Sequence, residues 1–316
     1  MLGSDPMISS AETTEIAAAL ARLPQFAGRT LDGAQIAPLA SLTNRNYKVS
    51  IGGEAYVLRI AGEGTERYID RAAEARNAQL AASIGIAPEL LYLDPPSGLM
   101  LTRFIDGGLS LQAADMHRPE LLRSAVGLLK RLHDSGLAFA GRMDLFPKLD
   151  EYMALAAQRG WPGGLDLTPI RRRAEPARAA LEGAAAPLVP SHIDPVPQNF
   201  VRGRAPAHQP TLYLLDWEYA AMAEPMWDLA AVSIEAELDA AQERLLLDTY
   251  FGGAAALQAG RFALYKASLN LLAAAWAVVQ LVDGNPSADF AAFARQRLAW
   301  HAAVTESAVY RAYVAP

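Results

Sequence analysis

The chain has 316 residues, of which 52% are apolar and 20% charged, the composition of a folded globular protein rather than a disordered one. It contains no cysteine, which excludes disulfides, zinc–thiolate sites and a cysteine nucleophile. Its net charge of −6 argues against nucleic acid or an anionic membrane surface as the main partner. The first residues lack the features of a signal peptide, and the most apolar stretch, 267–282, is shorter than the about 20 residues of a bilayer span. We therefore expect a cytoplasmic protein without a membrane span.

The first third of the chain combines helical and β patterns. The expected elements are a helix at 13–22, strands at 46–51 and 55–60, a helix at 69–84, and strands at 90–93 and 99–105. The first two strands are separated by Gly52-Gly53-Glu54, a spacing that predicts a β-hairpin. Asp106-Gly107-Gly108 then breaks the pattern and predicts a hinge. We expect an N-terminal nucleotide-binding lobe at 8–105.

The remaining chain, 106–316, is expected to form a larger helical lobe that carries catalysis and acceptor binding. Its predicted helices are 119–135, 149–159, 170–182, 227–250, 262–282 and 290–310. One irregular region, 192–216, interrupts these helices and contains extended runs at 199–201 and 213–215.

The irregular region holds the densest chemical signal. His192, Asp194 and Asn199 have the spacing H-x-D-x-x-x-x-N, which is that of a kinase catalytic loop. In such a loop the aspartate accepts the hydroxyl proton of the acceptor and the asparagine reaches a metal ion on the nucleotide phosphates. Asp216 follows an apolar strand, where a kinase places a carboxylate that binds Mg²⁺. We predict Asp194 as the base, Asn199 and Asp216 as metal ligands, and a structural role for His192.

A kinase also needs a cation that aligns the phosphates. Kinases usually place a lysine on the third strand of this lobe. Arg59 lies at the matching position, and Glu74 on the next helix is its expected partner. Lys48 is the alternative cation. The turn before the hairpin has no glycine-rich motif, but its hydroxyl and amide groups are candidates for phosphate binding: Ser41, Thr43, Asn44 and Asn46.

Together these motifs resemble the choline/ethanolamine kinase family, and more broadly the aminoglycoside-phosphotransferase superfamily. The resemblance runs from about residue 39 to the last helices and includes the segments 216–220 and 225–230. It implies an α+β, protein-kinase-like bilobal fold: a small N-terminal antiparallel sheet lobe with one main helix, and a larger, mostly helical C-terminal lobe. It also implies ATP and Mg²⁺ as cofactors, with adenine held near Thr102 and Phe104. One departure is Ile193, where many relatives have asparagine.

The acceptor site is expected in the C-terminal half. Residues 216–250 contain nine acidic residues against one basic residue, Arg244, and acidic and aromatic side chains attract cations. On a continuous helix, Asp228, Glu235 and Asp239 would share roughly one face. The candidate acceptor residues are Glu218, Tyr219, Trp227, Asp228, Glu235, Trp276 and Phe293. The resemblance matches Glu235 and Trp276 to the choline site, whereas a second tryptophan common in the family is replaced by Ala273.

These observations predict a kinase that transfers the γ-phosphoryl group of ATP to a small cationic alcohol, choline or a related amino alcohol. An aminoglycoside or other sugar-alcohol kinase is the alternative on the same fold, since acidic clusters also bind polycationic sugars. The alternative from another class is a nucleotide-binding pseudokinase that acts as a regulatory module. The presence of Asp194, Asn199 and Asp216 together argues against it, because a binding module does not need all three. Only 10 residues separate Asp216 from Trp227, too few for the activation segment of a protein kinase. The oligomeric state does not follow from the sequence.

Overall fold

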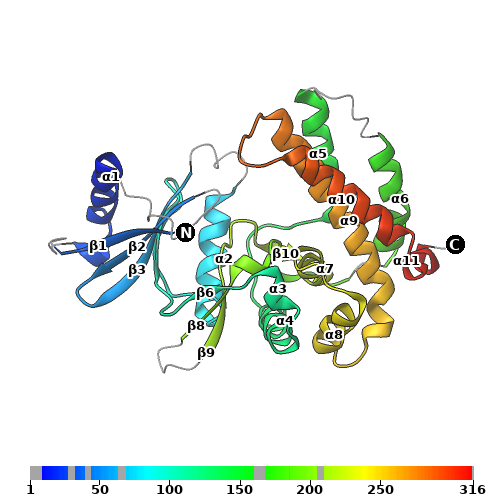
Figure 1. Cartoon of the computed structure of the whole chain (residues 1–316), viewed down its shortest axis with the longest axis horizontal. Helices are drawn as coiled ribbons and strands as arrows, with labels where there is room; N and C mark the ends of the chain where they lie inside the picture. The colour runs from blue at the N-terminus through cyan, green and yellow to red at the C-terminus, as the bar shows by residue number, and fades with distance from the viewer. Residues whose placement is uncertain are drawn as a thin grey trace, which may run out of the picture. The chain divides into compact units, whose positions relative to one another are not determined.

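The computed structural model describes residues 9–27, 33–39, 44–62, 69–159, 168–184, 186–204 and 210–314 (Figure 1). The chain divides into two compact units. The first consists of Met1–Leu109 and Val201–Tyr219, and the second of Ser110–Phe200 and Ala220–Pro316. The sequence predicts a single division at 105/106, which would place Asp216 in the C-terminal lobe. In the structure the segment Val201–Tyr219, which carries Asp216, belongs to the first unit.

The first unit contains a five-stranded sheet in the order β1-β2-β3-β5-β4, in which all neighbours are antiparallel. The strands are β1 (Gln35–Leu39), β2 (Arg45–Ile51), β3 (Glu54–Ile60), β4 (Leu90–Asp94) and β5 (Leu99–Arg103). Gly52 and Gly53 join β2 to β3 with φ of 60° and 81°, the positive values that a tight hairpin turn of this kind requires. The predicted hairpin is confirmed, whereas β1 was not predicted.

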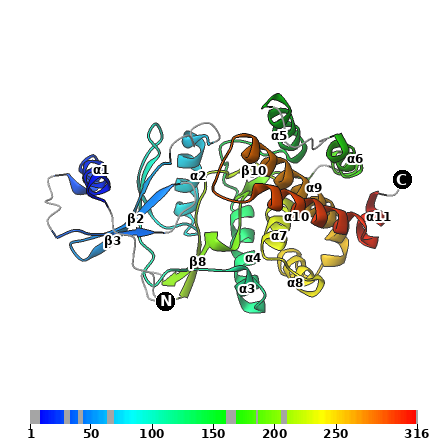
Figure 2. The same ribbon diagram turned by 45° about the horizontal axis from the view of Figure 1, so that its top comes forward.

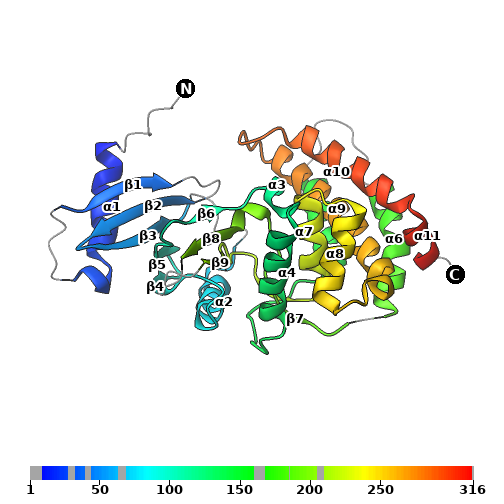
Figure 3. The ribbon, with the colours of Figure 1, turned by 60° about the horizontal axis from the view of Figure 1, so that its bottom comes forward.

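Two helices pack on this sheet. Ser10–Ala21 forms α1, which lies across one face of the sheet (Figure 3), and Arg71–Ser83 forms α2, which contacts β4. The core between α1 and the sheet contains Ile16 and Leu20 together with Val49 and Leu58, all at most 1% exposed. Each fully buried aliphatic side chain of this kind stabilises a fold by about 1.5–3 kcal/mol. The first unit therefore has a core of its own.

The last part of the first unit brings Asp216 to its place. Phe200–Arg204 (β8) and Pro210–Leu214 (β9) belong to a sheet of order β6-β8-β9, in which β6 is Leu109–Ser110. The Leu214 backbone N–H donates to the carbonyl oxygen of Ile86 at 2.8 Å, and the Trp217 Nε1 donates to the Leu214 carbonyl oxygen at 3.2 Å. These bonds fix the chain on both sides of Asp216.

The second unit is mostly helical, and its longest helix, α9 (Ala255–Val282), lies at its centre (Figure 2). Contacts with α9 are made by α5, α6, α7, α8, α10 and α11. The helices are α3 (Ala113–Met116), α4 (Pro119–His133), α5 (Leu145–Arg159), α6 (Thr168–Glu182), α7 (Met226–Glu235), α8 (Ala240–Phe251), α10 (Phe290–Thr305) and α11 (Ala308–Val314). Two short antiparallel strands, β7 (Val189–Ser191) and β10 (Ala221–Ala223), form a small sheet.

The predicted continuous helix at 227–250 is wrong. The helix α7 ends at Glu235, and α8 begins after Asp239, whose side chain accepts the backbone N–H groups of Ala241 and Gln242. An aspartate that caps a helix in this way competes with helix continuation. Asp228, Glu235 and Asp239 therefore do not share one helix face. The predicted helix at 290–310 is likewise divided into α10 and α11.

Within the described residues, α9 is the one helix long and apolar enough to cross a membrane. However, 83% of its most apolar 18-residue window is buried inside the protein, as expected for a core helix.

Candidate active site

The second unit carries the predicted catalytic loop between β7 and β8. Asp194 is half-buried in this loop, and Asn199 ends the 3-10 turn Pro197–Asn199. The Asn199 Nδ2 donates to the Asp194 carbonyl oxygen at 2.9 Å, so the two residues of the motif are joined across the loop. The Val196 backbone N–H donates to the same carbonyl oxygen at 2.9 Å. The five-residue spacing thus produces a closed turn in which the Asn199 side chain is bound to the Asp194 backbone.

The residue before the predicted base has a strained backbone. Ile193 has a φ of 74°, a value that is rare for a β-branched residue. Its N–H donates to Asp228 Oδ1 at 2.8 Å, and its carbonyl oxygen accepts from the Trp227 Nε1 at 2.9 Å. Such strain persists where the surroundings over-determine the conformation. Asp228 and Trp227, both on the first turn of α7, provide that constraint.

Asp228 is fully buried and bound on several sides. Its Oδ2 accepts the His192 backbone N–H at 2.8 Å and contacts the His133 Nε2 at 3.0 Å. Burial acts to raise the pKa of the Asp228 carboxyl, but the hydrogen bonds from His133 and from the His192 backbone outweigh it and hold that pKa below its usual value. The sequence places Asp228 and Trp227 at the acceptor site, whereas the structure makes both of them supports of the catalytic loop.

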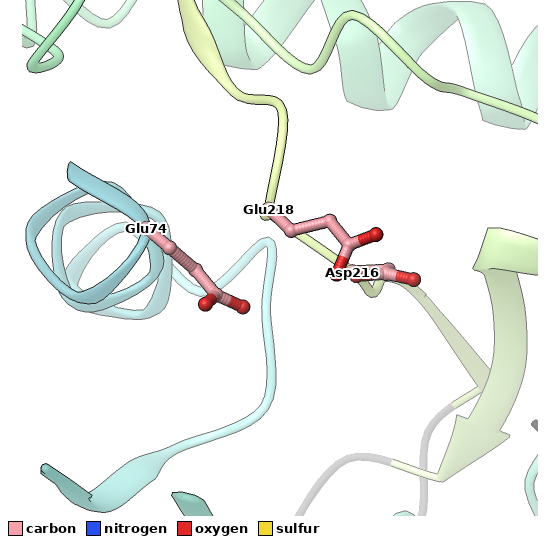
Figure 4. A group of neighbouring side chains, drawn as sticks. All are labelled: Glu74, Asp216 and Glu218. Carbon is pink, nitrogen blue, oxygen red and sulfur yellow. The ribbon is translucent and has the colours of Figure 1, made fainter. Parts of the chain in front are cut away.

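The first unit carries a cluster of three carboxylates, of which Glu74 and Glu218 are buried and Asp216 is exposed. Glu74 comes from α2, and Asp216 and Glu218 come from the segment after β9 (Figure 4). One carboxylate oxygen from each lies within 4.8 Å of the other two. Asp216 has a φ of 66°, an unusual conformation in a residue that follows a strand. The predicted metal ligand therefore has two acidic neighbours, and Glu218, which the sequence places among the acceptor residues, is one of them.

Two buried arginines accompany these acids. Arg59 forms the predicted ion pair with Glu74, and Arg71 donates to the other oxygen of Glu74 at 2.8 Å. Arg71 also lies 3.8 Å from Glu218. Sequence reasoning missed Arg71, although its position three residues before Glu74 on one helix is a signal for such a contact.

The cluster has three acids against two bases, and its electrostatics reflect this excess. Burial, followed by the charges of Asp216 and Glu74, raises the pKa of Glu218 to about 8. Desolvation of its carboxyl, together with the charge of Glu74, also raises the pKa of Asp216. For Glu74 burial acts in the same direction, but hydrogen bonds from Arg59 and the charge of that guanidinium lower its pKa overall. A bound divalent cation would favour the ionised form of all three, and carboxylate oxygens are the ligands that Mg²⁺ prefers. The residues present therefore fit a magnesium site.

The structure describes some, but not all, of the other residues that the sequence predicts to bind the nucleotide. Asn44 donates to Glu218 at 3.4 Å, and Asn46 lies opposite Arg59 on the neighbouring strand. The alternative cation, Lys48, has its Nζ 4.1 Å from the centre of the Phe104 ring. Thr102 lies on β5, opposite Val57. Ser41 and Thr43 lie outside the described residues.

The structure brings some of the predicted acceptor residues together in the second unit. Trp276 on α9 contacts Phe293 on α10 edge-to-face, with ring centroids 6.0 Å apart. Glu235, at the end of α7, forms an ion pair with Arg297, which also lies over the Phe293 ring. Sequence reasoning missed Arg297, although it lies one helical turn after Phe293. Tyr219 is half-buried and belongs to the first unit.

The fold and the two sets of polar residues define a phosphotransferase: an antiparallel sheet unit with a buried arginine–glutamate pair, and a helical unit with a kinase-type loop. Residues 35–263 match the model of the phosphotransferase enzyme family known as APH. The chain belongs to this family and, within it, to the choline/ethanolamine kinases, as the following comparisons show.

A crystal structure of a choline/ethanolamine kinase family protein from Mesorhizobium loti is 34% identical, covers 96% of this chain and 97% of its own, and has a TM-score of 0.80. The choline kinase LicA from Streptococcus pneumoniae is 25% identical over 85% of this chain and 93% of its own, with a TM-score of 0.73. Protein LicA from Haemophilus influenzae is 29% identical over 209 residues, 66% of this chain and 76% of that protein. The protein is therefore an ATP-dependent kinase with a small-molecule alcohol as acceptor.

Proposed function

We propose that the protein transfers the γ-phosphoryl group of ATP to the hydroxyl group of choline or a closely related amino alcohol. The observation that carries the catalytic part is the closed loop in which Asn199 holds the backbone of Asp194. The acceptor class is supported by the activities that the names of the similar proteins state. The expected cytoplasmic location stays a prediction.

Asp194 is the proposed general base. It accepts the proton of the acceptor hydroxyl while that oxygen attacks the γ-phosphorus and the bond to the β-phosphate oxygen breaks. ADP is then the leaving group, and the proton remains on Asp194 until it passes to solvent. The strained, over-determined backbone of Ile193 fixes the direction in which Asp194 leaves the loop. Positioning of this kind supplies much of the catalysis in phosphoryl transfer.

In the first unit, Asp216 and Glu218 would hold Mg²⁺; Asn199, which the sequence predicts as a further metal ligand, belongs to the second unit. When bound, the ion neutralises charge on the nucleotide phosphates. Glu74 is already bound by two arginines, so its main task is to hold Arg59 in place. Arg59 can then donate to phosphate oxygens from a fixed position, and its planar guanidinium suits that role. The candidate nucleotide residues on the strands, Asn46, Thr102 and Phe104, belong to the same unit.

The test is an acceptor screen by ADP release with choline, ethanolamine, an aminopropanol and kanamycin at saturating MgATP. We expect turnover with at least one amino alcohol, and we expect it to fall by a factor of about 10²–10⁴ in Asp194→Asn. Turnover with kanamycin alone would favour the aminoglycoside alternative. Nucleotide binding without turnover on any acceptor would favour the pseudokinase alternative.

A further inference from the structure

One arginine of the second unit is almost completely buried at the end of α7. The side chain of Arg297, on α10, is 5% exposed, and its Nη2 donates to both carboxylate oxygens of Glu235 at 2.7 and 2.9 Å. A guanidinium keeps its positive charge under physiological conditions. Glu235 is therefore neutralised by a cation that belongs to the protein itself.

The same guanidinium covers aromatic rings. Its central carbon lies 4.6 Å from the centroid of Phe293 and 5.0 Å from that of Trp300, both on α10. These are distances at which a cation is attracted to a ring face. Phe293 in turn contacts Trp276, which also packs against Phe290 with centroids 5.5 Å apart. A carboxylate and aromatic ring faces, which could attract an ammonium group, are thus already in contact with the Arg297 guanidinium.

This arrangement is tied to the catalytic loop through α7. Asp228 at the beginning of that helix binds the backbone of Ile193, beside Asp194, and Glu235 follows seven residues later. At 1.5 Å per residue the two positions are about 10 Å apart along the helix axis. The helix α7 therefore joins the catalytic loop at its first turn to the Glu235–Arg297 pair at its last turn.

We propose that Arg297 determines acceptor specificity by occupying the place of the acceptor's cationic group between Glu235 and the rings, which weakens the preference for charged over neutral alcohols. The inference rests on the proposed function, because it requires an alcohol acceptor in the second unit. The sequence predicts that Glu235 binds the cationic group of the acceptor, whereas here Glu235 binds Arg297. Paired with Arg297, that carboxylate contributes no net negative charge to the acceptor site.

The test compares choline with 3,3-dimethylbutan-1-ol, which has the same shape without the charge. The quantity measured is the ratio of kcat/KM for choline to that for the neutral alcohol. In Arg297→Met the freed carboxylate and rings should raise this ratio by about two- to thirty-fold, while the KM for ATP stays the same. Arg297→Lys keeps the positive charge and should remain near the parent ratio. Arg295→Met, an exposed arginine on the same helix, is the matched control.

Arg297→Gln tests the proposal even if Arg297→Met does not fold, because glutamine removes the positive charge but still donates a hydrogen bond to Glu235. We expect this variant also to raise the choline-to-neutral ratio, since it leaves the Glu235 carboxylate without a cationic partner. A ratio that is unchanged in a folded Arg297→Met or Arg297→Gln would overturn the proposal while leaving the kinase assignment intact. A parent protein that phosphorylates neither alcohol nor any other amino alcohol would instead remove the proposed function, and this inference with it.

Discussion

Carboxylates of the same chemical type behave differently in the two units because their partners differ. Asp228 accepts hydrogen bonds from two backbone N–H groups and also contacts the His133 ring. Its pKa is therefore lowered although the side chain is completely buried. Glu218 is also buried, but its nearest charged neighbours include two further acids, and its pKa is raised to about 8. The first carboxylate is stabilised as an anion by the protein, whereas the second needs a cation from outside.

The raised pKa of Glu218 predicts a pH-dependent stability of the metal-free protein. Below about pH 4 the carboxyl is protonated in both the folded and the unfolded chain, so it does not affect the free energy of unfolding. Between there and about pH 8 the unfolded chain loses the proton while the folded chain keeps it, and the free energy of unfolding falls as the pH rises. Glu218→Gln cannot ionise, so in EDTA it should melt above the parent at pH 8 and close to it at pH 4. Equal melting temperatures of the two proteins at pH 8 would show that Glu218 is not a destabilising acid.

Asp194→Asn should separate catalysis from binding. Loss of a general base typically costs about 10²–10⁴ in rate, and the residues proposed to bind the nucleotide in the first unit are untouched. We expect kcat to fall by that factor while the calorimetric Kd for ATP is retained. Asp134→Asn, an exposed carboxylate of the second unit paired with Lys130, is the control, since such a surface pair is worth about 0–1 kcal/mol. A kcat that matches the parent would remove Asp194 from the mechanism.

Among the elements, the helix α7 contacts the catalytic loop through its first turn and ends at Glu235. Asp228 accepts the backbone N–H of the strained Ile193, and the Trp227 side chain donates to the Ile193 carbonyl oxygen. The helix N-terminus also favours an acidic residue at this position. The conformation of the loop is therefore a property of α7 as much as of the loop itself.

Removing the Asp228 carboxylate should affect both stability and rate. Asp228→Ala leaves the buried backbone N–H groups of His192 and Ile193 without their acceptor, at a cost of about 1–3 kcal/mol for each group, so it should lower the melting temperature strongly. Asp228→Asn preserves the shape but loses one acceptor, and we expect a milder loss of stability with a lower kcat and an unchanged KM for ATP. Glu237→Gln, an exposed acid just beyond α7, should leave the melting curve and the kinetics at parent values. A folded Asp228→Asn with parent kcat would show that the loop keeps its geometry without this carboxylate.

The sequence predicted the elements that depend on local patterns and missed those that depend on distant partners. The hairpin at Gly52-Gly53 and the helix α2 were correct, because turn glycines and helical periodicity are read over a few residues. The continuous helix at 227–250 was wrong, because the capping role of Asp239 was overlooked. Arg297 could not be paired with Glu235 from the sequence, because the two are 62 positions apart and meet only when α7 and α10 have packed.

At the scale of the whole molecule, the nucleotide should stabilise the protein through the first unit. A ligand at 100 times its Kd stabilises the folded state by about 2.7 kcal/mol. For a chain of 316 residues this corresponds to a rise in melting temperature of roughly 4 °C. We expect ATP alone to give part of this rise, through Arg59 and the strand residues, and MgATP to give more.

Asp216→Asn isolates the contribution of the metal. The variant keeps Arg59 with its partner Glu74, so ATP alone should shift its melting temperature as it shifts that of the parent. It lacks one of the three carboxylates that fit Mg²⁺, so the additional shift on adding Mg²⁺ should be reduced, and activity should require more Mg²⁺. Asp106→Asn, an exposed acid of the same unit, should behave as the parent in both titrations. If Asp216→Asn retained the full Mg²⁺-dependent shift, the carboxylate cluster of the first unit would not be the metal site, because the ion would then bind without its central ligand.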